Sequence, residues 1–247
     1  MGKLIFAFDF DGTVVDGTTL GFEKVKMALM LSGLQSDSEE VDNALRQNYG
    51  ASLKELLKIM YKAGGGGVNG SCKYSEFRKK FDVLNREMDN NLSVDNSLVK
   101  AIDYIPNSQV IKVLITSRKR KCLNQTVKKI GFDLDIFNYI QTADSYEFIK
   151  PDGRVFRPLI KMSFREKVSI EDIFYFGDTL EYDYAAVKNS GFPIKFIGIA
   201  SGVNTVEEFK DAEIPESRIV PSFQEFAGFL QGLVEEIETG VNLAAVI

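Results

Sequence analysis

Apolar residues run without interruption from Leu4 to Phe8, and acidic residues follow at once. An aromatic and β-branched run with no polar alternation is typical of a strand buried on both faces, as in a parallel sheet. We therefore expect residues 4–8 to form an inner strand of an α/β protein.

Further runs of the same kind recur along the chain, with amphipathic stretches between them. The strand-like runs are Val110–Ile115, Phe137–Gln141, Asp172–Phe176 and Ile194–Ile199. The helical patterns are Leu123–Ile130, Val155–Met162, Asp183–Asn189 and a closing helix within Ser222–Ile237. Strands that alternate with helices predict a doubly wound parallel sheet, a Rossmann-like core.

The stretch from residue 16 to 101 interrupts this alternation. It is charged, lacks β-rich runs and shows helical periodicity in five segments: Phe22–Leu31, Val41–Gln47, Leu53–Tyr61, Tyr74–Met88 and Val94–Ile102. We expect a helical cap over residues 16–101, inserted into a catalytic core of residues 1–15 and 102–247. Gly64–Gly67 lacks the Lys-Ser/Thr and strand context of a phosphate-binding loop, which favours a flexible connector between cap helices.

Composition excludes several kinds of chemistry. The 247 residues include no histidine, which rules out Ser-His-Asp and Cys-His catalysis and histidine-ligated zinc. The two cysteines and the absence of a signal peptide lead us to expect a cytoplasmic protein. A formal charge of −5 argues against nucleic-acid or anionic-membrane partners, and no apolar run reaches the ~18 residues that would span a bilayer.

Two carboxylates directly follow the first predicted strand. Asp9 and Asp11 precede Gly12 at the carboxyl end of that strand, which is where open α/β sheets bind ligands. Such carboxylates repel each other unless a cation or a shared proton neutralises them, and Mg²⁺ prefers oxygen ligands. A polar turn that caps the next helix is the alternative for an isolated Asp-x-Asp.

Other predicted strand ends also carry polar residues. In chain order they are Thr116 and Ser117, then Lys150 with Pro151, then Gly177, Asp178 and Thr179, with Asp183 five residues beyond Asp178. Each has a structural explanation when taken singly: a helix cap, a surface ion or a turn. Together, at the carboxyl ends of parallel strands, they predict one site.

With these four motifs the chain resembles the haloacid dehalogenase-like superfamily. Asp9–Thr13 looks like its first motif, Thr116 like the second, Lys150-Pro151 like the third, and Gly177-Asp178 with Asp183 like the fourth. An insertion between the first two motifs implies a helical cap of the first type. The segments 186–208 and 220 onward resemble phosphoglycolate-phosphatase-like members, whereas the match through the cap is weak.

The resemblance implies a mechanism and a set of site residues. Asp9 would attack phosphorus and Asp11 would act as general acid and base. Mg²⁺ would lie between Asp9, the Asp11 carbonyl and Asp178, with Asp183 orienting the metal's surroundings. The phosphate oxygens would be held by Thr116, Ser117 and Lys150.

Two features depart from a simple assignment. The third motif usually reads Lys-Pro-x-Pro, whereas here Lys150-Pro151 is followed by Asp-Gly-Arg, so Lys161 is a possible substitute. Cys72 and Arg78 have the Cys-x5-Arg spacing of thiol phosphatases, but the bulky intervening residues favour coincidence.

The favoured function is a phosphomonoesterase for a small phosphorylated metabolite, such as a phosphoglycolate-like compound or a sugar phosphate, in a monomer or homodimer. A phosphomutase and a non-catalytic binding protein on the same scaffold are the alternatives. Mutase relatives use a cap histidine near the place of Gly21, and this chain has no histidine. A segment resembling the family's specificity loop contains Arg46, Tyr49, Gly50 and Ser52.

Overall fold

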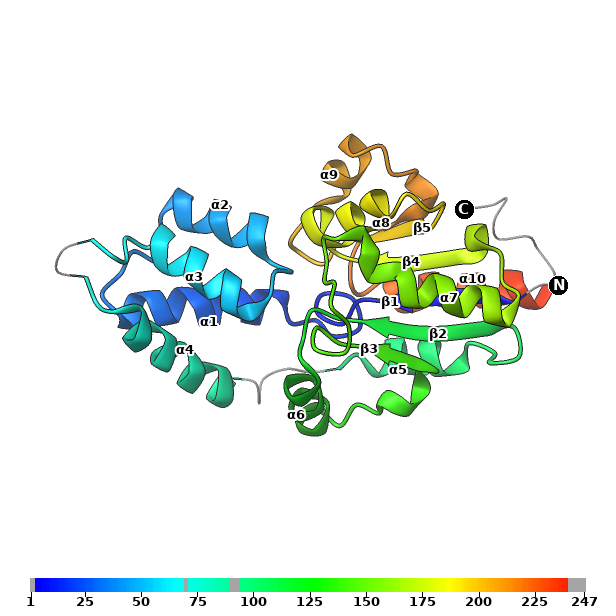
Figure 1. Ribbon diagram of the computed structural model, residues 1–247, viewed down its shortest axis with the longest axis horizontal. Helices are drawn as coiled ribbons and strands as arrows, with labels where there is room; N and C mark the ends of the chain where they lie inside the picture. The colour runs from blue at the N-terminus through cyan, green and yellow to red at the C-terminus, as the bar shows by residue number, and fades with distance from the viewer. Residues whose placement is uncertain (1–2, 69–70, 89–93, 240–247) are drawn as a thin grey trace.

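A parallel sheet organises the larger part of the protein, as shown by the computed structural model in Figure 1. The structure describes residues 3–68, 71–88 and 94–239. Within them the strand order is β3-β2-β1-β4-β5-β6, and every pairing is parallel. The strands are β1 (Leu4–Phe8), β2 (Val110–Ile115), β3 (Tyr139–Gln141), β4 (Ile173–Gly177), β5 (Lys195–Ile199) and β6 (Ile219–Val220). The predicted fold class is confirmed, and β6 is an addition to the predicted strands.

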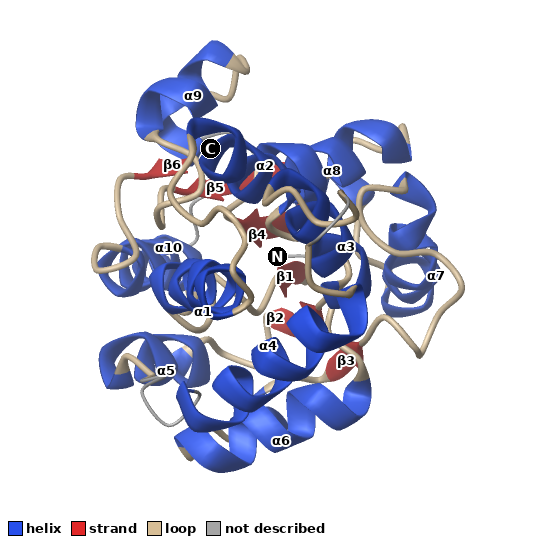
Figure 2. Ribbon diagram, turned by 90° about the vertical axis from the view of Figure 1, so that its left-hand side faces the viewer, coloured by secondary structure: helices blue, strands red, loops and turns tan. Residues whose placement is uncertain are grey.

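Helices cover both faces of the sheet. They are α5 (Asn96–Tyr104), α6 (Arg120–Ile130), α7 (Arg157–Glu166), α8 (Ala185–Ser190), α9 (Val206–Asp211) and α10 (Phe226–Thr239). Figure 2 shows α5 and α10 on one side of the strands and α7 and α8 on the other. The inner strands are buried on both faces because alternate residues enter different cores: Phe6 and Phe8 pack with α5 and α10, whereas Ile5 and Ala7 pack with α7 and α8.

Short turns shift several predicted boundaries. Residues Leu134–Ile136 form a 3₁₀ turn, so β3 begins at Tyr139 rather than at residue 137. A second 3₁₀ turn over Gly153–Phe156 precedes α7, and a π-helical turn, Leu180–Tyr184, takes in Asp183 before α8 begins. Helix α10 begins four residues after Ser222.

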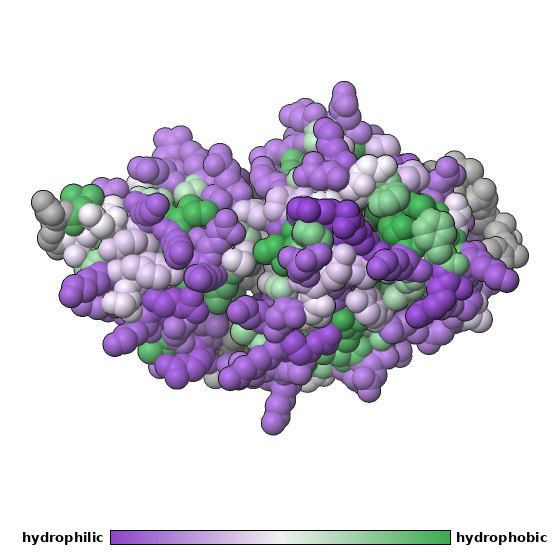
Figure 3. Space-filling model, viewed as in Figure 1, coloured by the Kyte–Doolittle hydropathy of each residue, from purple (hydrophilic) through white to green (hydrophobic). Residues whose placement is uncertain are grey.

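The insertion forms a separate helical unit beside the end of the sheet (Figure 1). Its helices are α1 (Thr18–Leu31), α2 (Glu39–Asn48), α3 (Leu53–Ala63) and α4 (Tyr74–Met88), and they share an apolar core of their own. Gly64–Gly67 lies between α3 and α4. In the space-filling view the surface is hollowed between this cap and the sheet domain at its upper edge (Figure 3).

The helix α5 packs with the sheet rather than with the cap. Its buried residues Leu98, Ala101 and Ile102 belong to the same apolar cluster as Phe6 and Phe8. A cap limit at residue 101 would cut through this helix and assign its first six residues to the cap, so we propose that the cap ends before α5. No helix within the described residues is long and apolar enough to cross a membrane.

Candidate active site

Asp9 lies at the end of β1, where the strand leaves the middle of the sheet. Its backbone N–H still donates to the carbonyl of Phe176 on β4 at 2.9 Å, so the residue stays tied to its neighbour strand. The side chain is only 7% exposed, and one carboxylate oxygen lies 2.8 Å from Lys150 Nζ. Asp9 is therefore a buried carboxylate whose charge is offset by one fixed ammonium group.

Asp178 and Asp183 complete a group of three buried carboxylates with Asp9. One oxygen from each lies within 4.8 Å of the others, an arrangement able to hold a metal ion. Lys150 Nζ also contacts Asp183 Oδ1 at 2.6 Å, so it bridges two members of the group. One cation thus faces three carboxylates, and a divalent cation would neutralise the excess of negative charge.

The carboxylate of Asp183 is already surrounded by donors. The Tyr175 hydroxyl and Lys150 Nζ donate to Oδ1, while the backbone N–H and hydroxyl of Thr179 donate to Oδ2. Asp178 has fewer donors in the described structure, namely the Ser201 hydroxyl at 3.2 Å. Because the oxygens of Asp183 are already occupied by donors, we favour Asp9 and Asp178 as direct metal ligands. Asp183 would instead hold Lys150 and Thr179 in place.

Burial dominates the electrostatics of this group. It raises the pKa of Asp9 from 3.8 to about 7, with Lys150 opposing the rise and Asp183 and Asp11 adding to it. It also raises the pKa of Asp178 well above its usual range, and the charges of Asp183 and Asp9 raise it further. Burial alone would lower the pKa of Lys150, but its two carboxylate partners outweigh burial and keep the ammonium charged.

Two glycines allow this close packing. Gly12 has φ = +75°, and a Cβ atom there would lie 2.0 Å from Asp178 Oδ2. A Cβ atom on Gly177 would lie 2.6 Å from Cβ and Cγ of Asp183. Since real Cβ atoms do not approach other atoms so closely, glycine at both positions lets the acidic side chains reach the site.

Asp11 lies beside this group but outside it. Its carboxylate accepts two hydrogen bonds from Arg118, from Nε at 2.7 Å and from Nη2 at 2.6 Å. Arg118 belongs to the basic run that follows the second predicted strand, and its pairing with Asp11 was not predicted. The two residues are 107 positions apart, so no local signal in the sequence links them.

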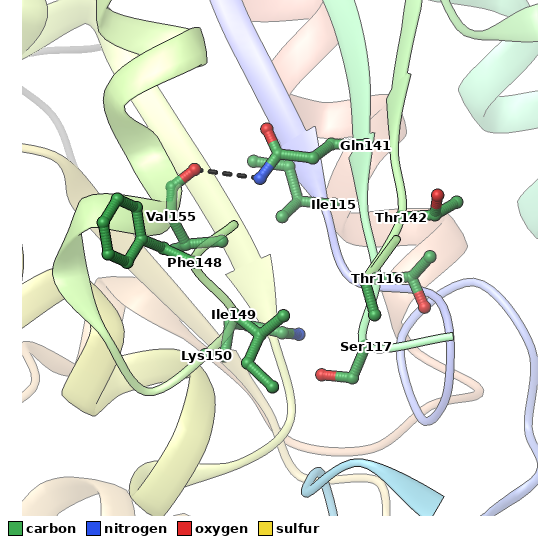
Figure 4. Close-up of a pocket in the computed structure, with 10 residues that line it drawn as sticks. Ile115, Thr116, Ser117, Gln141, Thr142, Phe148, Ile149, Lys150 and Val155 are labelled. Atoms are coloured by element: carbon green, nitrogen blue, oxygen red, sulfur yellow. Dashed lines mark hydrogen bonds between the residues drawn. The ribbon is translucent and has the colours of Figure 1, made fainter. Parts of the chain in front are cut away.

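Thr116 and Ser117 follow β2 on the same side of the sheet. Figure 4 shows Ser117 and Lys150 across a small pocket of about 10 Å³ that Thr116, Gln141 and Thr142 also line. The Ser117 hydroxyl is buried and has no hydrogen-bond partner in the described structure, so a donor group is available at this position.

The two candidate lysines of the third motif differ in their surroundings. Lys161 is exposed on α7, whereas Lys150 is 3% exposed among the carboxylates.

Among the predicted cap residues, Tyr49 packs on the start of α1, with its ring 5.0 Å from that of Phe22. Its hydroxyl donates to the carbonyl of Gly17 at 3.2 Å, and burial together with the charges of Asp11 and Asp178 raises its pKa. A Cβ atom on Gly50, where φ is +115°, would lie 2.8 Å from the ring of Tyr182, so the cap touches the loop of the fourth motif here. Ser52 caps α3, and Arg46 is exposed on the last turn of α2.

The residues Cys72 and Arg78, which have the Cys-x5-Arg spacing of thiol phosphatases, do not form an anion-binding loop. The helix α4 begins at Tyr74, between the two residues, and Arg78 pairs with Asp82 at 2.9 Å along that helix.

Two further residues of the site were not predicted from the sequence. Tyr175 reads as one more core aromatic of β4, and Ser201 lies in a loop after β5 with no local signal of its contact with Asp178.

Comparison with known proteins agrees with this geometry. The family model described as haloacid dehalogenase-like hydrolase matches residues 6–199. No curated protein matches the chain. Among solved structures, a predicted phosphoglycolate phosphatase from Haemophilus somnus has a TM-score of 0.70 at 18% identity, covering 93% of this chain and 98% of its own.

Two other solved structures have similar scores. A β-phosphoglucomutase described as putative, from Thermotoga maritima, has a TM-score of 0.66 at 18% identity and covers 96% of this chain and 100% of its own. A haloacid dehalogenase-like hydrolase from Bacteroides fragilis, also described as putative, has a TM-score of 0.66 at 20% identity, covering 91% and 99%. At these identities the likeness shows a shared fold, which phosphatases and mutases both use.

Proposed function

The chain belongs to the haloacid dehalogenase-like hydrolase family, and we propose that within it the protein is a Mg²⁺-dependent phosphomonoesterase that forms an aspartyl-phosphate. The observation that carries the proposal is the buried group of Asp9, Asp178 and Asp183 with Lys150 between two of its members. A single fixed cation among three carboxylates leaves an excess of negative charge that one divalent metal would neutralise, and the metal together with Lys150 would then attract the phosphate group.

The donor set suits Mg²⁺. The carboxylates of Asp9 and Asp178 and the main-chain carbonyl of Asp11 would hold it, and all three supply the hard oxygen ligands that Mg²⁺ prefers. When bound, the metal supplies positive charge that neutralises these carboxylates and the transferring phosphoryl group. Gly12 supports this assignment, because its missing Cβ is what lets Asp178 approach the Asp9–Asp11 loop.

The reaction of the chain's own residues has two steps. In the first, an oxygen of Asp9 attacks phosphorus while Asp11 gives a proton to the departing alcohol oxygen. In the second, Asp11 takes a proton from water as the water oxygen bonds to phosphorus and the Asp9–phosphate bond breaks. The hydroxyls of Thr116 and Ser117 and the ammonium of Lys150 hold the phosphate oxygens through both steps.

Substrate selection is assigned to the cap. We propose that Tyr49 and the Gly50–Ser52 turn face the leaving group, because Tyr49 lies within electrostatic range of Asp11 and Asp178 and Gly50 packs on Tyr182. Arg46 would pair with a carboxylate or second phosphate of a small metabolite when the cap closes. The substrate class is a small phosphate ester.

The test is phosphate release by the purified protein. We expect Mg²⁺-dependent hydrolysis of p-nitrophenyl phosphate, silenced by EDTA, and a steeply raised Mg²⁺ requirement in Asp178→Ala. Asp9→Asn should lower kcat by at least about 10³-fold, because it removes the nucleophile without changing the side chain's shape. Asp152→Asn, a half-buried carboxylate that pairs with Arg154 and is not a member of the buried acidic group, is the control and should retain full activity.

The outcomes separate the alternatives. A panel of phosphorylated metabolites, scored for both free phosphate and isomerised phosphate, distinguishes a phosphatase from a phosphomutase. Activity of Asp9→Asn within about tenfold of the wild type, a barrier change of only ~1.4 kcal/mol, would contradict the nucleophile assignment. A folded, Mg²⁺-binding wild type with no turnover of any ester would indicate a non-catalytic binding protein.

A further inference from the structure

Arg118 holds the carboxylate of Asp11 through a two-point fork. Nε donates to Oδ2 at 2.7 Å and Nη2 donates to Oδ1 at 2.6 Å, so both oxygens of Asp11 are engaged by one planar cation. A bidentate arginine–carboxylate pair fixes the rotation of the carboxylate as well as its position. Both side chains remain a little over a quarter exposed, so the pair lies at the edge of the buried acidic group, where Asp11 is open to a substrate.

The arginine is itself held from three other directions. Its remaining Nη1 donates to Thr126 Oγ1 on α6 at 2.7 Å, and the guanidinium lies 5.5 Å from the centroid of the buried Phe10 ring. Its backbone N–H donates to the Thr116 hydroxyl at 3.1 Å. A long cationic side chain with this many anchors loses little further freedom when it orients a partner.

The fork joins two parts of the site that the sequence separates. Asp11 follows β1, whereas Arg118 follows β2, two residues after the predicted phosphate ligand Thr116. The loop that would bind the phosphate therefore also sets the direction of the Asp11 carboxylate. Proton transfer demands this control, because a displacement of about 1 Å at a reacting group can cost about 10²-fold in rate.

We propose that Arg118 is a positioning residue for Asp11, a role that rests on the proposed phosphatase function. Arg118 orients the side chain of Asp11, which in its protonated form passes its proton to the leaving oxygen as the Asp9–phosphorus bond forms and the phosphorus–oxygen ester bond breaks. The same orientation serves the second step, in which Asp11 takes the proton of the attacking water and phosphate leaves Asp9. Arg118 acts through Asp11 and does not contact substrate.

The structure supplies a matched control in Arg154. That side chain also forks onto an aspartate, Asp152, with Nε 2.9 Å from Oδ1, and its guanidinium lies 3.9 Å from the ring centroid of Phe148. It shares the aspartate fork and the aromatic contact of Arg118, although it is 52% exposed and its aspartate is not a proposed catalytic residue. Any loss common to Arg118→Ala and Arg154→Ala reports a general effect of removing such a fork.

The experiment measures single-turnover and steady-state kinetics of the full chain on two substrates. p-Nitrophenolate leaves without needing a proton, whereas the alcohol of an alkyl phosphate needs one. In Arg118→Ala we expect phosphorylation by the alkyl phosphate to slow by about 10- to 100-fold, with KM within about threefold. Phosphorylation by p-nitrophenyl phosphate should change less than about threefold, with a burst of product before slow hydrolysis.

Added guanidinium ion provides a second readout. It should restore part of the lost rate in Arg118→Ala and have no such effect on the wild type or on Arg154→Ala, because only the first variant has a vacant guanidinium site beside Asp11. Arg118→Lys should retain an intermediate rate. If Arg118→Ala fails to fold, Thr126→Val keeps the fork while removing its Nη1 anchor and should show a smaller loss with the same substrate dependence.

Several results would overturn the proposal. Equal losses on both substrates without rescue would make Arg118 a purely structural residue, and a raised KM with unchanged kcat would make it a substrate ligand. Unchanged kinetics in every Arg118 variant would remove the role altogether while leaving the phosphatase function intact. A wild type inactive on all esters would instead show that the proposed function itself is wrong.

Discussion

The raised pKa of Asp9 predicts how the metal-free protein responds to pH. Burial raises this pKa from 3.8 to about 7, against the opposing charge of Lys150. Between these two values the folded protein keeps a proton on Asp9 that the unfolded chain has released. The folded state therefore binds more protons, and the free energy of unfolding must fall as pH rises from about 4 to about 7.

The size of the effect follows from the same two values. A difference of about three pH units corresponds to at most about 4 kcal/mol, at ~1.36 kcal/mol per unit. Asp9→Asn replaces the carboxyl by a neutral group of the same shape and removes this dependence. The variant should match the wild type near pH 4.5 and exceed its stability above pH 7, by up to about 10 °C in Tm for a chain of this size.

Thermal and urea unfolding in EDTA, from pH 4.5 to 8, measures this difference. Asp152→Asn is the control, because the side-chain and backbone hydrogen bonds of Arg154 lower the pKa of Asp152 to about 2, the opposite direction. That stabilisation is present above the unfolded pKa and is lost only in more acidic solution, so its difference curve stays flat from pH 5 to 8. A flat curve for Asp9→Asn, or a variant less stable than the wild type at pH 8, would refute the reasoning.

Two further predictions test the metal site and the cap. Gly12→Ala should abolish the rise in Tm caused by Mg²⁺, because its Cβ would displace Asp178, whereas Gly33→Ala, with φ = +67° and nothing within 4 Å of its Cβ, should keep that rise. Equal responses to Mg²⁺ in the two variants would contradict the role of Gly12. Arg46→Ala should raise KM several-fold for the natural anionic substrate and leave p-nitrophenyl phosphate hydrolysis nearly unchanged; equal losses on both would place Arg46 outside the specificity set.

The sheet could be predicted from the sequence because its signals are local. The run from Leu4 to Phe8 is apolar on both faces, and it ends where Asp9 begins. The strand β6 and the packing partner of α5 depend on tertiary contacts and could not be predicted. The strand β6 has only two residues, Ile219 and Val220, which is too short for any periodicity, and α5 shows the same amphipathic pattern whether it packs on the cap or on the sheet.

The basic run after β2 shows why the rest of the site needed the structure. By composition, Arg118 to Lys121 is four similar cations, and charge alone predicts only that they attract anions. The turn from β2 into α6 points the side chain of each of these four residues in a different direction. Arg118 turns inward to Asp11, Arg120 reaches the carbonyl of Ile140 at 2.9 Å, and Lys119 and Lys121 stay exposed.

This difference follows from backbone geometry rather than from side-chain chemistry. Arg118 is still held by the Thr116 hydroxyl at the end of the strand, so its side chain shares the edge of the sheet with Asp11. By Arg120 the chain has entered α6, where successive side chains diverge by about 100° around the helix axis. The turn from β2 into α6 therefore decides which of the four basic residues can serve the reaction. Only Arg118 reaches Asp11 and is proposed as a positioning residue, whereas the other three make surface or loop contacts.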